Sequence, residues 1–132
     1  MNKNSHEKSK YQAILLNINL IGSRSEVMDA EQYRPNDPLK FDVKLEIFVG
    51  IEGDNEGSER FDIFVCTPSM LEESLNSEDC VMGHGNLIVR SYSYEKIVNY
   101  IKSYISMCKG RTIDDVMRRV GLLGDWESEW EI

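Results

Sequence analysis

The sequence predicts a single α+β domain in which a mainly antiparallel sheet of about four to five strands carries helices from the C-terminal half. Three observations lead to this prediction. Several segments alternate apolar and polar residues with a period of two, and two later segments repeat apolar residues at helical spacing. The connections between neighbouring predicted strands are short, which favours antiparallel pairing. The chain has 132 residues, the length of one ordinary domain.

The first predicted strand follows a polar N-terminal segment. Residues 1–10 are expected to form a flexible tail, so that the domain spans residues 11–132. The segment 11–21 alternates as a half-buried strand does, and its apolar positions are expected to share one face. These positions are Ile14, Leu16, Ile18 and Leu20.

The next two predicted strands, 41–49 and 61–67, form an antiparallel hairpin around an acidic loop that contains glycine. Both strands place apolar residues at every second position. Phe48 and Phe64 fall on the otherwise polar face. They are expected either to pair with each other across the two strands or to lie under a helix.

The helices begin at recognisable start signals. Thr67 supplies an N-cap oxygen and Pro68 suits the first helical position, so a short helix is predicted there. A strand over 86–92 follows. Apolar residues at helical spacing predict a helix over 94–109, and a weak capping box at Thr112 predicts one more.

The C-terminal segment 125–132, DWESEWEI, reads as a closing strand with two different faces. Trp126, Ser128, Trp130 and Ile132 alternate with three glutamates. The tryptophans are expected to close the core against the C-terminal helices, and the alternative is that one of them anchors a partner. The purely acidic face contributes nothing to folding, and it would suit a partner that presents a row of Lys or Arg.

The formal net charge is −8, and the acidic residues gather in two blocks. Residues 51–80 carry nine acids and one base, and residues 125–132 carry four acids and no base. Proteins that bind nucleic acids present clustered Lys and Arg, so the sequence argues against that class. The acidic blocks either keep the protein in solution or capture a basic partner by electrostatic steering.

The sequence gives little support to catalysis. Cys80 and His84 form one candidate pair, but zinc requires three or four ligands, and no second pair has suitable spacing. The three cysteines do not form a disulfide framework, and neither a phosphate-binding loop nor a nucleophile motif is present. We therefore expect no enzyme activity and no metal or other cofactor. The cysteines are better read as reduced thiols, which predicts a cytoplasmic protein. No signal cleavage site follows the first apolar run, and no stretch is long enough to span a membrane.

Three stretches, in this order, resemble the immunity protein 8 family of bacterial polymorphic-toxin systems. They are FDIFVCTPSML (61–71), LIVRSYSYEKIVNYI (87–101) and GRTIDDVMRRVGLLGDWESEWE (110–131). The resemblance covers roughly residues 40–131. It implies a cytoplasmic, non-enzymatic inhibitor that binds the toxic C-terminal domain of a delivered bacterial effector, as in contact-dependent growth inhibition, and blocks its active site.

Charge clustering then suggests which residues contact the toxin, with a basic nuclease as the expected target. The predicted contacts are Glu127, Glu129 and Glu131 of the closing strand and Glu52, Asp54, Glu56 and Glu59 of the acidic loop, with Glu72 and Glu73 as second candidates. The alternative function is a self-associating structural or regulatory module that pairs through the Phe48 and Phe64 surface or an open sheet edge. A homodimer is compatible with the sequence but is not predicted.

Overall fold

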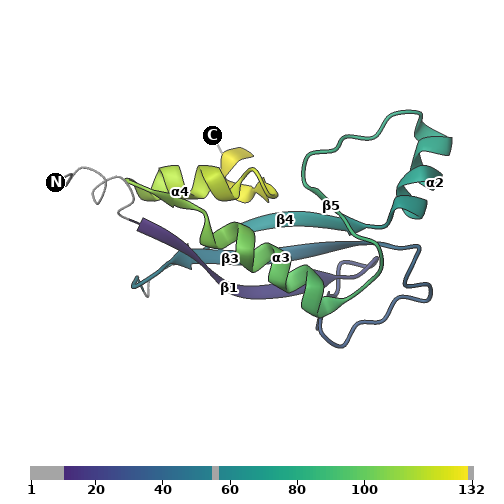
Figure 1. The fold of residues 1–132 in the computed structure, drawn as a ribbon, viewed down its shortest axis with the longest axis horizontal. Helices are drawn as coiled ribbons and strands as arrows, with labels where there is room; N and C mark the ends of the chain where they lie inside the picture. Colours follow the sequence, from purple (N-terminus) through teal and green to yellow (C-terminus); the bar gives the residue numbers. More distant parts are fainter. Residues whose placement is uncertain (1–10, 55–56, 131–132) are drawn as a thin grey trace.

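The computed structural model describes residues 11–54 and 57–130, with the side chains of Glu129 and Trp130 excepted. The expected N-terminal tail, Glu56 and Glu131 therefore lie outside the described residues. The described chain forms one α+β domain with a seven-stranded, mainly antiparallel sheet, which confirms the predicted fold class. Figure 1 shows the sheet as a long twisted layer, with the helix α3 (Tyr94–Ser106) crossing in front of it.

The main strand order of the sheet is β2-β1-β3-β4-β5. The bounds are Tyr11–Ile21 for β1, Val27–Met28 for β2, Asp42–Ile51 for β3, Glu59–Cys66 for β4 and Asn86–Ile88 for β5. Two further short strands extend it: β6, Lys109–Gly110, pairs with β1, and β7, Asp125–Trp126, pairs with β4. β3 and β4 form the predicted hairpin. β5 runs parallel to β4, because the helix between them returns the chain to the same edge.

A β-bulge corrects the predicted face of β1. The register against β3 shifts between Leu15 and Asn17, so Leu16 is an extra residue in the strand. One inserted residue moves the following side chains to the opposite face. Ala13 and Leu20 consequently both point into the core, while Leu16 is 53 % exposed. A strict alternation had placed Leu16 and Leu20 on the same face.

The helices of the second half cover one face of the sheet. Their bounds are Tyr94–Ser106 for α3 and Ile113–Val120 for α4. Ser93 and Thr112 cap them through their hydroxyl oxygens, as predicted. Their buried side chains form one cluster with alternate residues of β3 and β4. This core includes Leu45, Ile47, Val49, Phe61, Ile63, Val65, Ile97, Ile101, Ile105, Val116, Met117 and Val120.

The remaining helix, α2, spans Pro68–Glu78 and has no buried residue. Thr67 is its N-cap residue by backbone conformation, but its hydroxyl does not cap the helix as predicted. The Thr67 hydroxyl instead accepts a hydrogen bond from the backbone N–H of Phe41 at 3.2 Å. In Figure 1, α2 lies beyond the end of β4, away from α3 and α4. α2 therefore contributes surface rather than core.

The predicted closing strand is wrong. Only Asp125 and Trp126 pair with β4, and Glu127–Trp130 form a 3₁₀ helix, η1. Trp126 Nε1 and Ser128 Oγ both donate to the same Glu59 oxygen, at 2.8 and 2.9 Å. The chain curls around this carboxylate instead of extending along the sheet. Ile132 lies outside the described residues.

The predicted strand over 86–92 is shorter than expected. It leaves the sheet after Ile88, and the Tyr92 N–H bonds to the carbonyl of Pro38 in a loop. The two phenylalanines do not pair with each other, because Phe48 lies opposite Arg60 and Phe64 lies opposite Lys44. Both alternate with core residues that pack against α3 and α4, so neither lies under these helices.

Candidate partner-binding surface

The sheet face opposite α3 and α4 is open. It carries the side chains that alternate with the core residues of β3 and β4, among them Lys44, Glu46, Arg60, Asp62 and Phe64. All five are half-buried or exposed. We call this surface the open sheet face. An antiparallel sheet with one face in the core commonly leaves the other face to solvent or to a partner.

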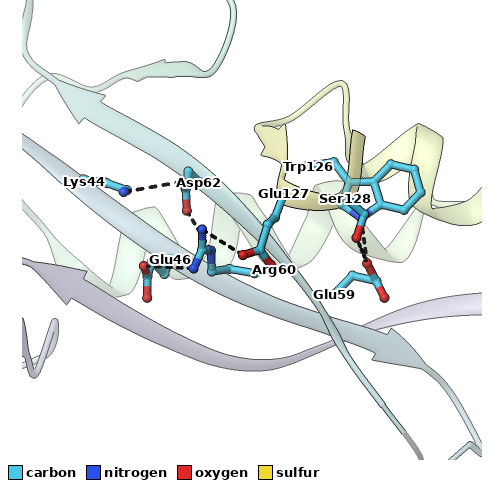
Figure 2. Close-up of polar contacts among 8 residues, drawn as sticks. All are labelled: Lys44, Glu46, Glu59, Arg60, Asp62, Trp126, Glu127 and Ser128. Atoms are coloured by element: carbon cyan, nitrogen blue, oxygen red, sulfur yellow. Dashed lines mark hydrogen bonds and ion pairs between the residues drawn. The ribbon is translucent and has the colours of Figure 1, made fainter. Parts of the chain in front are cut away.

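Arg60 lies at the centre of a charged network on the open sheet face, as Figure 2 shows. Its guanidinium contacts three carboxylates: Glu127 at 3.2 Å, Asp62 at 3.5 Å and Glu46 at 3.8 Å. Lys44 approaches the other side of Asp62 at 3.4 Å. Three negative and two positive groups thus form one network that restrains side chains from β3, β4 and η1.

The network is only partly hydrogen-bonded. Arg60 Nε and Asp62 Oδ1 are buried, and within the described residues neither has a hydrogen-bond partner. They face each other at 3.5 Å, a separation that preserves the charge attraction but is too long for a good hydrogen bond.

Apolar side chains lie on both sides of the charged network. Leu16 lies over Gly50, where a Cβ would come within 2.8 Å of the leucine methyl group, so the glycine makes room for this side chain. Ile14, opposite Gly50 in register, is 38 % exposed. Phe64 is 43 % exposed. Protein-binding surfaces combine exposed apolar residues with polar and charged ones.

The region around Phe64 is also hollowed. A cavity of about 490 Å³ opens between β1, β2 and β3, and its walls include Met28, Tyr33, Val43 and Phe64. Its opening is wide, so it is suited to a side chain of a partner protein rather than to an enclosed small molecule.

The structure divides the predicted acidic contacts between two ends of the molecule. Glu52 and Asp54 follow β3 at one end of the hairpin and are exposed. Glu72 and Glu73 lie on α2 after the far end of β4, and Glu73 pairs with Lys40 at 2.8 Å. The eight residues of β4 separate these ends by about 25 Å. A single acidic surface over residues 51–80 is therefore not formed.

Two of the predicted contact residues, Glu127 and Glu59, form contacts within the protein. Glu127 is held by Arg60, and Glu59 accepts two hydrogen bonds from the C-terminal segment. The side chain of Glu129 is not described. Trp126 stacks on Phe61 with ring centroids 6.0 Å apart, which confirms its predicted role in closing the core.

The candidate metal pair, Cys80 and His84, gains no set of further ligands among the described residues. His84 contacts Asp125 at 3.2 Å, and no group of three or more potential ligands is found among the described residues. Burial raises the pKa of the Cys66 thiol and of the Cys108 thiol, so both favour the less reactive thiol form. None of the described helices is long and apolar enough to span a membrane.

Sequence reasoning missed Arg60, Leu16 and Phe64 as members of a common surface. Arg60 is the single base within the acidic segment 51–80, and this isolation was the available signal. Leu16 was assigned to the core because the bulge is not visible in the alternation. Phe64 was correctly placed on the otherwise polar face, but the residues beside it could not be predicted because they depend on the register between strands.

Comparison with known proteins gives one match. A family model described as immunity protein 8 matches residues 16–130, a longer region than the resemblance over 40–131 had indicated. The matched region includes most of β1 as well as the hairpin, the helices and η1. No curated protein and no solved structure shows significant similarity to the chain.

Proposed function

Since the chain belongs to the immunity protein 8 family and is therefore an immunity protein that neutralises a toxin, we propose that it covers the toxin's active site with its open sheet face. The observation that carries this proposal is the organisation of that face. Leu16 and Phe64 are exposed on either side of charged side chains that are held by one another. Isolated exposed apolar residues are ordinary, whereas exposed apolar residues grouped with polar and charged ones support a protein contact.

The toxin that fits this surface has basic residues around its active site. A nuclease must attract phosphate and so presents Lys and Arg, which an acidic protein with net charge −8 attracts. We expect Glu52, Asp54 and Glu127 to guide such a toxin from one end of the face, and Glu72 and Glu73 from the other. Electrostatic steering raises association rates above the roughly 10⁵–10⁶ M⁻¹s⁻¹ of neutral docking. This speed matters to a cell that receives an already active toxin.

Neutralisation of the toxin by covering its active site requires no catalysis by the immunity protein. Its charged side chains bind and position the partner, and its apolar side chains exclude water from the contact. Arg60 is held by three carboxylates, so the network loses little further conformational entropy on binding. We place this encounter in the cytoplasm of the cell that makes the protein, as in contact-dependent growth inhibition.

The proposal is tested by binding the toxin domain encoded beside this gene to a double variant, Leu16→Ala with Phe64→Ala. Both residues are exposed, so the fold should be retained. Truncating two apolar contacts of the proposed interface should weaken the affinity at least about 10-fold, mostly through faster dissociation. Met107→Ala is the matched control, because Met107 is 68 % exposed and follows α3 on the opposite side of the sheet.

Two results would contradict parts of the proposal separately. Unchanged affinity of the double variant would place the contact away from the open sheet face. A bound toxin that still cleaves its substrate at the normal rate would show that the active site is not covered. If the toxin is a nuclease, an excess of non-cleavable nucleic acid should displace the immunity protein from it.

A further inference from the structure

The cavity that opens between β1, β2 and β3 adjoins the open sheet face. Two of its wall residues, Lys44 and Phe64, also belong to that face. A partner that lies over the open sheet face therefore reaches the mouth of the cavity. The volume of about 490 Å³ has room for one long side chain, since pockets of this size hold drug-sized ligands.

Apolar and aromatic side chains form much of the cavity wall. Met28, Tyr33 and Val43 are partly buried and pack against the hydrophobic core. The Tyr33 ring also packs edge-on against Tyr92, with the ring centroids 5.3 Å apart. These contacts restrain the wall in the absence of a partner. Such a wall suits a side chain with a long hydrocarbon stem, because it covers the methylene groups.

Two carboxylates lie on the same wall and come from different elements. Glu26 belongs to the turn between β1 and β2, and Asp42 is the first residue of β3. Both residues are exposed, and neither forms an ion pair within the described part of the chain. Glu26 Oε1 accepts the backbone N–H of Arg24 at 2.9 Å, which restrains this carboxylate against the turn.

The bases close to these carboxylates in the fold do not neutralise them. Lys44 lines the cavity, but its ammonium contacts Asp62 at 3.4 Å and is balanced within the charged network around Arg60. Arg24 is in the same turn as Glu26, but it is not among the described residues that line the cavity, and it forms no ion pair with any of them. A cation that enters the cavity would therefore find two carboxylates available.

We propose that this cavity receives an arginine side chain of the toxin, an inference that rests on the proposed contact between the toxin and the open sheet face. The guanidinium would pair with Glu26 and Asp42, and its hydrocarbon stem would lie along the apolar wall. Arginine suits the cavity better than lysine, because its planar group has five donors for two carboxylates and stacks on aromatic rings. Tyr33 and Phe64 supply such rings.

Glu26→Gln with Asp42→Asn tests the pairing in stopped-flow binding of the toxin domain encoded beside this gene. Both changes retain the side-chain shape, and an amide oxygen can still accept the Arg24 N–H, so the fold should be retained. We expect dissociation to become at least about 10-fold faster, because the arginine is left without its partners. Glu95→Gln with Asp115→Asn is the matched control.

The control removes the same charge from exposed residues in the first turns of α3 and α4. Its dissociation rate should stay within about 2-fold of the wild-type rate, and its association rate should match that of the cavity variant, Glu26→Gln with Asp42→Asn. Circular dichroism confirms that each variant is folded. If the cavity variant only slowed association, Glu26 and Asp42 would act at a distance and the proposal would be overturned.

The arginine is identified by replacing each arginine of the toxin domain by alanine in turn. The affinity of each toxin variant is measured for the wild-type immunity protein and for Asp42→Asn. At one position the two losses should be non-additive, with a coupling of at least about 10-fold in Kd. Additive losses at every arginine would exclude arginine as the occupant of the cavity.

These measurements separate this inference from the proposed function. If Leu16→Ala with Phe64→Ala weakens binding while the cavity variant dissociates at the wild-type rate, the arginine contact is overturned. The proposal that the open sheet face covers the toxin would then stand. If neither variant changes the affinity, both proposals fail.

Discussion

The indole of Trp126 donates a hydrogen bond to the Glu59 carboxylate at 2.8 Å, and this contact ties the C-terminal segment to the first residue of β4. Glu59 had been expected to face a partner as part of an acidic loop. Its carboxylate is half-buried and also accepts the Ser128 hydroxyl at 2.9 Å. Glu59 is thus a structural residue, whose negative charge is used to hold η1 in place.

Trp126→Phe tests the strength of this contact. The phenyl ring can still stack on Phe61, but the hydrogen bond to Glu59 is lost. We expect the free energy of unfolding to fall by about 1–2 kcal/mol, because a bond to a charged acceptor is stronger than a neutral one. Urea unfolding measures the change. A double-mutant cycle with Glu59→Gln should give a coupling of about 1 kcal/mol, and additive effects would contradict the assignment.

The bulge in β1 predicts opposite outcomes for two leucines that simple alternation places on one face. Leu20 is 1 % exposed and Leu16 is 53 % exposed. Leu20→Ala should lower the free energy of unfolding by about 2–5 kcal/mol, because it leaves a cavity in the core. Leu16→Ala should change it by at most about 0.5 kcal/mol. If urea unfolding showed equal losses of the free energy of unfolding for the two variants, the bulge would be absent.

Tyr92 predicts a loss of stability at high pH. Its ring packs edge-on against Phe41 and Tyr33, and its hydroxyl donates to Ala30 O at 2.6 Å. Burial raises the pKa of Tyr92 from 10.0 to about 12, with a smaller contribution from Tyr33. A raised pKa means that folding favours the neutral phenol. Its stabilising contribution is therefore complete below pH 10 and is lost as the pH rises from 10 to about 12.

The Tyr92→Phe variant should lack this part of the alkaline loss. At neutral pH it should be less stable by about 1 kcal/mol, because Ala30 O loses its donor. Between pH 10 and about 12 its stability should fall less steeply than that of the wild type. Tyr100→Phe is the control for the removal of a phenol hydroxyl, because Tyr100 is 55 % exposed. Parallel pH curves for wild type and Tyr92→Phe would contradict the prediction.

The cysteines should differ sharply in reactivity. Cys80 is exposed, whereas Cys66 and Cys108 are buried and their thiol pKa values are raised by burial. A maleimide reagent applied to the folded protein should therefore attach once per chain, at Cys80, and Cys80→Ser should remain unlabelled. Mass spectrometry counts the labels. Rapid labelling of Cys108 in the native protein would show that α3 opens away from the sheet.

The sequence predicts elements well where a local signal decides them. Alternation identified β3 and β4, and the hydroxyl caps of Ser93 and Thr112 located the starts of α3 and α4. Trp126 was also correctly assigned to the closure of the core. These features depend on residues close together in the chain, so a single sequence is sufficient to predict them.

The features that were predicted wrongly or not at all depend on contacts between distant segments of the chain. The C-terminal glutamates occur at every second position, as in a strand. The segment instead forms η1, because Trp126 and Ser128 bind the carboxylate of Glu59, which lies 67 residues before Trp126. The bulge at Leu16 is defined by register against β3. The surface around Arg60 combines three elements. No pattern within one segment reports such pairings, so the open sheet face could not be assembled from the sequence.

The separation of the acidic residues gives a last prediction about toxin capture. Glu52 and Asp54 lie about 25 Å from Glu72 and Glu73, several times the Debye length of roughly 8 Å at physiological salt. The two pairs therefore act independently on an approaching toxin. We expect the hairpin end to dominate, because Glu127 adds another carboxylate near the start of β4. Reversing Glu52 and Asp54 to Lys should slow association by about 10-fold at low salt.

The matched control reverses Glu72 and Glu73 to Lys, which makes the same change in net charge at the α2 end. Its effect on the association rate should be less than about 2-fold, and raising the salt concentration should remove the difference between the variants. Stopped-flow association with the toxin domain measures both rates. A larger effect at α2 would move the approach of the toxin to the other end of the open sheet face. Equal, small effects would show that the acidic residues serve solubility and that apolar contacts alone decide the rate.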